Sequence, residues 1–518
     1  MVKLGFFYGI AAIILLPLML LTWQSLSQSS EIFGFLVKTV LTDVVINSLV
    51  ITGFTAIGVL VIGVSCAWLT TRYNFYGVRF LRWMLLFPLA FPSYILAYSY
   101  TDFFDVGGRL WQITGVDFLS IRSIGGACFI LSLCLYPYIY MFARTGFLIG
   151  SQSQLDAGKI LGANKWQQFF EIALPAARPF IIVGLMLVIM ESLSDYGTMA
   201  YFGIRVFSTG IYDAWAGYGD AIAAARLSLI LLSFIIVLIL IEKKQRQKMR
   251  FHTLETAENK ATSLLKVSGI KSLAMMLWCL LPVFFGFIFP VILLVSLAFE
   301  AMEYSPALPV IMAVIPYAIN SFILALIVSL VALIIAFTLV SFVRSHGTKT
   351  TRILYSICSF GYALPGVILG LGMLFVSSVF GDINFIVSSA FVFLVIAYLI
   401  RFLTISLQSF EAGFSKISPS IYQASKMMRS NIFYDFWQIK LPLLSSAILS
   451  AGLLLFVEVI KELPITLMLR PFDFDTLAVR AYHLASDERL GDAALPSLFI
   501  VIVGCIPVII LSRLQKYR

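Results

Sequence analysis

Long apolar stretches, each about as long as a membrane-crossing helix, recur along this chain. A helix needs roughly 20 mostly apolar residues to cross the hydrocarbon core of a bilayer. The alternating segments of about 10 residues that are typical of a transmembrane barrel are not the pattern here. The chain is therefore predicted to be an all-α polytopic membrane protein. Its predicted spans number about 12, at roughly 4–23, 44–70, 80–101, 124–143, 179–200, 223–241, 275–298, 317–343, 354–378, 385–407, 443–464 and 494–512.

Composition and charge agree with a membrane protein and indicate its orientation. Of the 518 residues, 60% are hydrophobic and only 12% are charged, against roughly 25% charged in a soluble protein. The net charge of +10 is concentrated in alternate loops, such as 242–272, while the opposite loops carry acidic residues such as Asp102, Asp105 and Asp213. By the positive-inside rule both termini are expected in the cytoplasm. The basic excess is explained by topology, so no nucleic-acid partner is expected.

The chain contains an internal repeat. Ile46-Asn47-Ser48 recurs as Ile319-Asn320-Ser321, and Ala90-Phe-Pro92 recurs as Ala363-Leu-Pro365. We expect Pro92 and Pro365 to kink their spans. Six spans in each half give the halves the same orientation, which is a parallel repeat. The predicted organisation is a first half at 1–241, a cytoplasmic linker at 242–272 and a second half at 273–518.

The cytoplasmic loop between the fourth and fifth spans carries the most specific motif. It contains Asp156, Ala157, Gly158 and Gly162, and it ends with Ile172-Ala173-Leu174-Pro175. This spacing resembles the EAA motif of ABC-importer permeases, which reads E-A-A, three residues, G, nine residues and I-x-L-P. The resemblance implies a type I importer fold, in which this loop docks on a separate ATPase subunit.

The second half carries a degenerate copy of the motif. It has Gln423, Ala424 and Ser425 at the start, Arg429 at the glycine position, and Leu441 and Pro442 at the end. Arg429 departs from the pattern, and the register of the ending is kept. Two copies in register favour docking over an ordinary amphipathic loop, and they imply two ATPase subunits, one for each half.

Physical chemistry explains why a docking loop needs these residue types. Small side chains at positions such as Ala157 and Gly158 allow a close approach to the ATPase. A glycine such as Gly162 can end a short helix in the left-handed conformation. A proline such as Pro175 fits the first turn of the next helix.

No catalytic motif is present in the sequence. It lacks the G-x-x-x-x-G-K-[ST] phosphate loop, so ATP is expected to be used by the partner ATPase, and no cofactor is expected on this chain. Its 3 histidines are far apart and its 6 cysteines form no C-x-x-C pair, so no metal site is assigned. The predicted role is a transport subunit and not an enzyme.

Further segments resemble one branch of the importer family. The runs from Glu191 to Gly203 and from Lys461 to Phe472 are similar to permeases for ferric iron. The resemblance implies a bacterial inner-membrane protein that receives iron from a periplasmic binding protein. The fused layout also occurs in thiamine and phosphonate permeases, so an importer for thiamine, phosphonate or polyamine is the alternative. A secondary transporter would not need the docking loops.

Two pairs of carboxylates are candidates for the translocation pathway. Glu191 and Asp195 are four residues apart, as are Glu458 and Glu462 in the second half. Residues four apart share a helix face, and ionisable groups inside a span usually face a cavity or a partner. Ferric iron is a hard cation that prefers oxygen ligands. The rival interpretations are a salt bridge with the neighbouring Lys461 and contacts that couple donor docking to gating.

Overall fold

The computed structural model describes residues 2–105, 107–116, 120–150, 152–255, 264–304, 307–380, 390–415 and 441–516. The described chain is almost entirely helical, which confirms the predicted fold class. It divides into two compact units, each of which is described by itself. Unit 1 comprises 1–29, 311–480 and 509–518, and unit 2 comprises 30–310 and 481–508.

Unit 2 holds most of the first half of the sequence together with the first span and most of the last span of the second half. Its helices and two short strands are α2 (Glu31–Thr39), α3 (Leu41–Arg72), β1 (Tyr73–Asn74), α4 (Val78–Met84), η1 (Phe87–Ala90), α5 (Ser93–Phe104), α6 (Arg109–Thr114), α7 (Ile124–Gly150), α8 (Gln152–Ile160), α9 (Lys165–Gln167), η2 (Gln168–Ala173), α10 (Leu174–Ser194), α11 (Gly197–Tyr201), α12 (Phe207–Tyr212), η3 (Asp213–Gly217), α13 (Ala221–Glu255), β2 (Leu265–Lys266), α14 (Ile270–Val283), η4 (Phe284–Ile288), α15 (Phe289–Tyr304) and most of α25 (Leu490–Lys516).

Unit 1 holds most of the second half and the first span of the chain. Its helices are α1 (Val2–Ser27), most of α16 (Ala307–His346), α17 (Lys349–Cys358), η5 (Gly361–Ala363), α18 (Gly366–Phe380), α19 (Ala390–Ser415), α22 (Leu441–Lys461) and α23 (Pro464–Leu469). The helix α24 (Leu477–Ser486) contains the division between the units at Arg480.

The compact units do not coincide with the halves of the sequence, because the first span of each half packs with the other half. In unit 1, α1 packs on α17 and α18, and Pro17 leaves no room for a side chain at Gly372. In unit 2, α14 packs on α3 and α4, and strand β2 pairs in parallel with β1, with Tyr73 opposite Leu265. The repeat boundaries stay a sequence prediction. Unit 1 includes the first span of the first half, and unit 2 includes the first span and most of the last span of the second half.

The described helices account for the predicted spans. Ten are long and apolar enough to cross a membrane, and two bent helix pairs bring the number to 12 if each pair is one span. The bent pairs lie at the predicted third and ninth spans. The chain turns by 92° between Ala90 and Ser93 and by 114° between Ala363 and Gly366. Pro92 and Pro365 lie in these breaks, which confirms the expected kinks and makes them sharp turns between separate helices.

The repeated Asn-Ser pair makes the same contacts in both halves. In unit 2, Asn47 donates to the carbonyl oxygen of Arg205 at 3.0 Å, and Ser48 accepts from the amide of Phe207, which begins α12. In unit 1, Asn320 donates to the carbonyl oxygen of Asp475 at 3.1 Å, and Ser321 accepts from the amide of Leu477, which begins α24. A helix start has unpaired N–H groups, so each serine satisfies one of them, and this explains the repeated motif.

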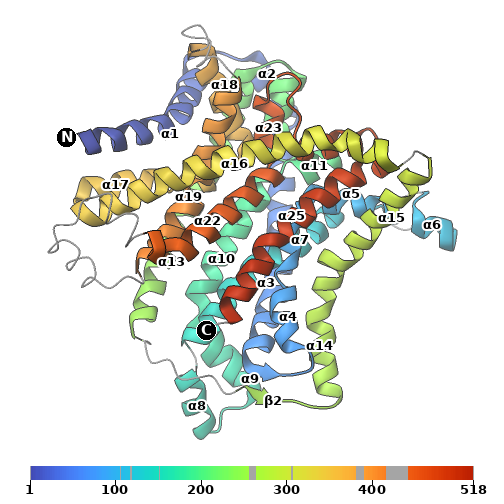
Figure 1. Ribbon diagram of the computed structural model, residues 1–518, viewed down its shortest axis with the longest axis vertical. Coiled ribbons are helices and arrows are strands. Elements are labelled where there is room, and N and C mark those ends of the chain that lie inside the picture. The colour runs from blue at the N-terminus through green and yellow to red at the C-terminus, as the bar shows by residue number, and fades with distance from the viewer. Residues whose placement is uncertain are drawn as a thin grey trace. The chain divides into compact units, whose positions relative to one another are not determined.

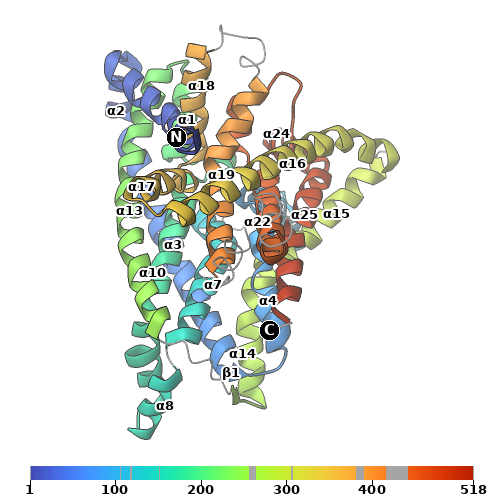
Figure 2. The same ribbon diagram turned by 60° about the vertical axis from the view of Figure 1, so that its left-hand side comes forward.

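Within unit 2, α3, α7 and α10 run side by side and form the core of the unit (Figure 1). The side chains of Ala67, Tyr136 and Ala177, one from each helix, are fully buried in one apolar cluster. Helices α2 and α8 lie at opposite ends of this core (Figure 2). The loop with the EAA-like motif is therefore at one end of the unit and the segments around α2 and α12 are at the other.

Candidate functional site

The EAA-like loop folds as a short helix that a glycine terminates. Helix α8 ends at Ile160, and Gly162 has a φ of +83°. The amide of Ala163 donates to the carbonyl oxygen of Gly158 at 2.9 Å, and the amide of Gly162 donates to that of Lys159 at 3.1 Å. These two bonds form a Schellman motif, in which the left-handed residue is usually glycine. The expected left-handed helix end at Gly162 is confirmed.

The buried side of the loop is fixed to the helices above it. A methyl group at Gly158 would overlap Cδ1 of Ile172, so Gly158 is small because the loop packs on itself. The side chain of Gln168 donates to the carbonyl oxygen of Ala163 at 2.8 Å and accepts from the buried Arg72 at the end of α3. The expectation that Gly158 gives room to an outside partner is therefore wrong, and its neighbour Ala157 is the exposed small residue.

The loop continues into the fifth span without a break. Asn164 caps α9 through its side chain, and α9, the π-helix η2 and α10 form one span of 30 residues from Lys165 to Ser194. The predicted start at 179 was too late, because polar residues near the helix start hide it from the apolar pattern. Pro175 is the second residue of α10, directly after η2, and so lies inside this continuous span and not at a free helix start as expected. In the π-helix η2 directly before α10, each backbone N–H bonds to the carbonyl oxygen five residues earlier, one residue further than in an α-helix.

Four exposed apolar side chains cover the outer side of the loop. Their exposed fractions are 87% for Ile160, 86% for Leu161, 74% for Trp166 and 52% for Phe170. The rings of Trp166 and Phe170 stack with centroids 5.7 Å apart. We call these four residues the loop patch. The motif comparison missed them because the motif leaves their positions free, although apolar residues beside charged Asp156 and Lys159 in a cytoplasmic loop were a usable signal.

The second copy of the motif is described only at its end. Gln423, Ala424, Ser425 and Arg429 lie outside the described residues, so the consequence of Arg429 stays a prediction. Leu441 and Pro442 are helical and lie in α22, as Leu174 and Pro175 lie in α10. Where the helix of the second copy starts lies outside the described residues.

Asp195 does not share a helix face with Glu191, contrary to expectation. Helix α10 ends at Ser194, and Asp195 has extended backbone with φ −66° and ψ 116°. Its carboxylate accepts from the amide of Thr198 at 3.0 Å and from the hydroxyl of Ser93. Asp195 therefore caps α11 and contacts the start of α5, both of which present unpaired N–H groups.

Glu462 has the equivalent place in unit 1. Helix α22 ends at Lys461, and the carboxylate of Glu462 accepts from the amide of Ile465 at 3.2 Å. It also pairs with the buried Arg401 at 3.4 Å, and a side chain at Gly366, the start of α18, would overlap both groups. Here too the helix ends before the second carboxylate, so the shared-face expectation is wrong.

The remaining carboxylate of each predicted pair stays on its span. Glu458 lies on α22, is partly exposed and pairs with Lys461 at 2.8 Å. The expected salt bridge of Lys461 is thus present, with Glu458 as its partner. Glu191 lies on α10 and is also partly exposed. A pathway role for Glu191, Asp195, Glu458 and Glu462 stays a prediction.

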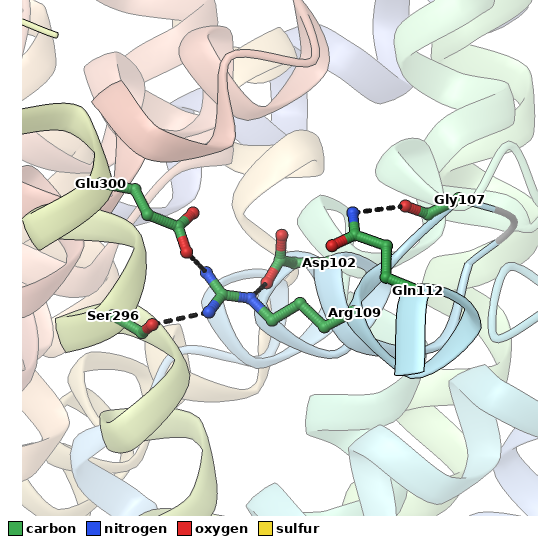
Figure 3. A network of polar contacts seen from close by, with 6 residues as sticks. All are labelled: Asp102, Gly107, Arg109, Gln112, Ser296 and Glu300. Atoms are coloured by element: carbon green, nitrogen blue, oxygen red, sulfur yellow. Dashed lines mark hydrogen bonds and ion pairs between the residues drawn. The ribbon is translucent and has the colours of Figure 1, made fainter. Parts of the chain in front are cut away.

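An ionic network organises the loop after the broken span of unit 2. Arg109 on α6 pairs with Asp102 on α5 at 2.6 Å and with Glu300 on α15 at 3.0 Å, and it donates to Ser296 at 2.6 Å (Figure 3). Nearby, Arg122 pairs with Asp105 at 2.9 Å. The network ties α6 to two long helices at the end of the unit that is opposite to α8.

Known proteins resemble this chain over one half or over nearly all of its length. The family described as binding-protein-dependent transport system inner membrane component matches residues 59–251, which include the loop patch. A Fe(3+)-transport system permease protein of Haemophilus influenzae is 22% identical over 95% of this chain and 93% of its own length. A ferric transport system permease protein of Actinobacillus pleuropneumoniae is 24% identical over 91% of this chain and 70% of its own length.

A shorter relative carries the family assignment. A molybdenum transport system permease protein of Escherichia coli is 30% identical over 219 residues, which are 39% of this chain and 94% of that protein. One half of this chain thus has the length of a whole single-half permease, which agrees with the repeat. Together with the apolar helices and the matched region, these similarities show that the chain belongs to the family of binding-protein-dependent inner-membrane transport components, as a multi-pass permease subunit and not an enzyme.

Proposed function

We propose that this chain is the permease of an ATP-driven importer that takes ferric iron from a binding protein on the outer side of a bacterial inner membrane. One observation carries the choice of iron. The relative named for Fe(3+) transport aligns with 95% of this chain as one fused polypeptide, whereas the molybdenum relative aligns with one half. The basic loops support a cytoplasmic position for both termini, and with this orientation the loop patch would face the cytoplasm as well.

The loop patch supports docking on a separate ATPase subunit. Exposed apolar groups such as Ile160, Leu161 and Trp166 are unfavourable in water, and covering them with a partner lowers the free energy. Two residues of the patch, Trp166 and Phe170, lie near the start of the 30-residue helix from Lys165 to Ser194. This helix is about 45 Å long at 1.5 Å per residue. A push on the patch is therefore transmitted along one helix to Asp195.

The far end of this helix is joined to the broken span. Asp195 accepts hydrogen bonds from Ser93, at the start of α5, and from Thr198 in α11. A displacement of α10 along its axis would move α5 relative to η1, across the 92° turn. The broken spans are in this way the parts of the chain that the ATPase cycle would move to open the pathway.

The cargo itself is a hard cation that prefers oxygen ligands. Glu191 and Glu458 are partly exposed on their spans, and we assign to them the attraction of the cation. Asp195 and Glu462 are held by helix starts and by Arg401, and we assign to them the positioning of the helices around the pathway.

Uptake in cells tests the substrate. Radiolabelled ferric iron is supplied at limiting concentration to cells with and without this chain, with molybdate, thiamine and polyamine uptake measured in parallel. Loss of iron uptake alone is the expected result, and Glu191→Gln should lower it while the amount of protein in the membrane is unchanged. Normal iron uptake together with loss of another solute would overturn the iron assignment and leave the family assignment intact.

A further inference from the structure

A cavity of about 290 Å³ lies in unit 2 at the end that is opposite to the loop patch. Its apolar wall is formed by Leu36 on α2, Val40 directly after α2, Leu41 and Val44 on α3, and Leu227 on α13. Arg205, Gly210, Asp213, Gly217 and Tyr218 form the other wall. We call this the α2–α13 cavity. Its volume is at the lower end of the range for small-molecule sites, so it suits a group the size of a lipid head and not a whole lipid.

Two opposite charges line this cavity. Among the described residues, no hydrogen bond or ion pair within 4.0 Å occupies the side chain of Arg205 or that of Asp213. Burial raises the pKa of the Asp213 carboxyl, and the charge of Arg205 acts in the opposite direction. Both residues are exposed, so a ligand can reach the two charged groups from outside. A ligand with one anionic and one cationic group could satisfy both, because hydrogen bonds between charged partners are the strong ones.

The cavity lies at the ends of two spans. Helix α3 begins at Leu41 and α13 begins at Ala221, and both are long enough to cross a membrane. Beyond the cavity on α3, the side chains of Ile46 and Leu49 are exposed, which in a spanning helix is contact with lipid. Phe35 of α2 and Tyr218 are also exposed and their rings are 6.5 Å apart. Aromatic side chains of this kind mark the boundary between lipid and water.

The walls of the cavity are fixed before any ligand arrives. Ser30 caps α2 and donates to Asp220 at 2.6 Å, and Asp220 accepts from the first amides of α13. The side-chain amide of Asn47 donates to the carbonyl oxygen of Arg205 at 3.0 Å and so fixes the backbone there. Side chains on fixed elements lose little freedom when a ligand binds, which favours affinity.

We propose that the α2–α13 cavity binds the head group of an amine-bearing phospholipid of the phosphoethanolamine type. The phosphate would pair with the Arg205 guanidinium and the ammonium would donate to the Asp213 carboxylate. The glycerol end would lie against Leu36 and Val40, and the acyl chains would follow the exposed face of α3 past Ile46. None of the four carboxylates assigned to the cargo pathway and none of the loop-patch residues lines this cavity. A bound lipid would tie α2 and α12 to the surrounding membrane.

Native mass spectrometry of the purified full chain tests this site. The protein is equilibrated with defined mixtures of phosphatidylethanolamine, phosphatidylcholine and phosphatidylglycerol, and the retained lipid is counted. Phosphatidylcholine has the same two charges but no N–H donor, so wild type should retain phosphatidylethanolamine roughly tenfold better, as expected for one charge-assisted hydrogen bond. Asp213→Asn should remove this preference, and Arg205→Ala should lower retention of all three lipids.

Lys38→Ala is the matched control, because Lys38 is an exposed cation on α2 that does not line the cavity. It should bind lipid as the wild type does. Equal retention of the three lipids by the wild type, or an equal effect of Lys38→Ala and Arg205→Ala, would overturn the proposal. Free phosphoethanolamine is added as a competitor in a separate arm. If it displaced the lipid at equal concentration, the ligand would be a soluble zwitterion and the lipid assignment would be wrong.

Discussion

Two glycines of the EAA-like loop, Gly158 and Gly162, disfavour a side chain for different reasons. Gly162 has a φ of +83°, which other residues rarely adopt, and at Gly158 a side chain would displace Cδ1 of Ile172. The EAA-like spacing singled out both positions. The sequence could not distinguish an inward from an outward small residue, since that depends on how the loop folds back on η2.

The conformation of Gly162 gives a prediction for coupling. Gly162→Val should strain the loop, because a left-handed backbone costs a non-glycine residue about 1–2 kcal/mol and more for a β-branched one. In proteoliposomes with the partner ATPase, we expect ATP hydrolysis to continue with less iron transported per ATP. Gly162→Asn is the control, since asparagine tolerates this conformation. A Gly162→Val protein that transports as well as the control would contradict this role.

The buried pair of Arg401 and Glu462 gives a prediction for stability. Arg401→Ala leaves a buried carboxylate without its cation, a change that typically costs about 3–5 kcal/mol. We expect a clear drop in the melting temperature of the purified protein, part of which Glu462→Gln should restore in the same chain. Lys461→Ala breaks the less buried pair with Glu458 and should have a small effect. Equal drops for the two single variants would show that burial of the pair does not matter.

At the scale of helices, the apolar pattern found the spans and missed how they begin, end and break. The fifth span begins at Lys165 because α9 and η2 extend it into polar sequence. The carboxylates Asp195 and Glu462 lie just beyond helix ends, where they cap the next helix, and a spacing of four residues cannot reveal that end. Pro92 and Pro365 did indicate the broken spans, although the sequence gives no angle.

The ionic network around Arg109 gives a prediction at this scale (Figure 3). Arg109→Ala removes the contacts of α6 with Asp102, Ser296 and Glu300. The backbone hydrogen bonds of α6 should therefore break and re-form more often. We expect faster amide hydrogen exchange in 109–114 and unchanged exchange in α7. Arg489→Ala, which breaks an exposed pair with Asp492, should leave 109–114 unchanged. Equal exchange in wild type and Arg109→Ala would mean that backbone packing alone holds α6.

At the scale of the whole chain, the repeat revealed the duplication but not the exchange of first spans. Hydropathy makes 4–23 and 275–298 look like any other span, and the surface on which each packs is a long-range property that no local pattern carries. The Asn-Ser pair was visible in both halves as a repeat. Only the structure shows that it fixes the start of α12 and of α24.

Two cysteines report the packing of α14 with the first half. Cys66 on α3 and Cys279 on α14 are fully buried in the same apolar cluster. If a protease site is inserted into the linker between 256 and 263, a short membrane-permeant thiol cross-linker should hold the two fragments together after cleavage. Cys66→Ser should let them separate on a denaturing gel. Separation of the cross-linked wild-type fragments would contradict the exchange.

The most direct test of the account is the dependence of transport on the loop patch. The chain is reconstituted in proteoliposomes with its ATPase and binding protein, and ATP-dependent uptake of ferric iron is measured for wild type and for Trp166→Ala with Leu161→Ser. Lys159→Ala, a polar change on the same loop, is the control. We expect the patch variant to lose ATPase binding and its uptake rate to fall at least tenfold. The control should retain both. Full uptake by the patch variant would contradict the central claim that a separate ATPase drives this permease through these side chains.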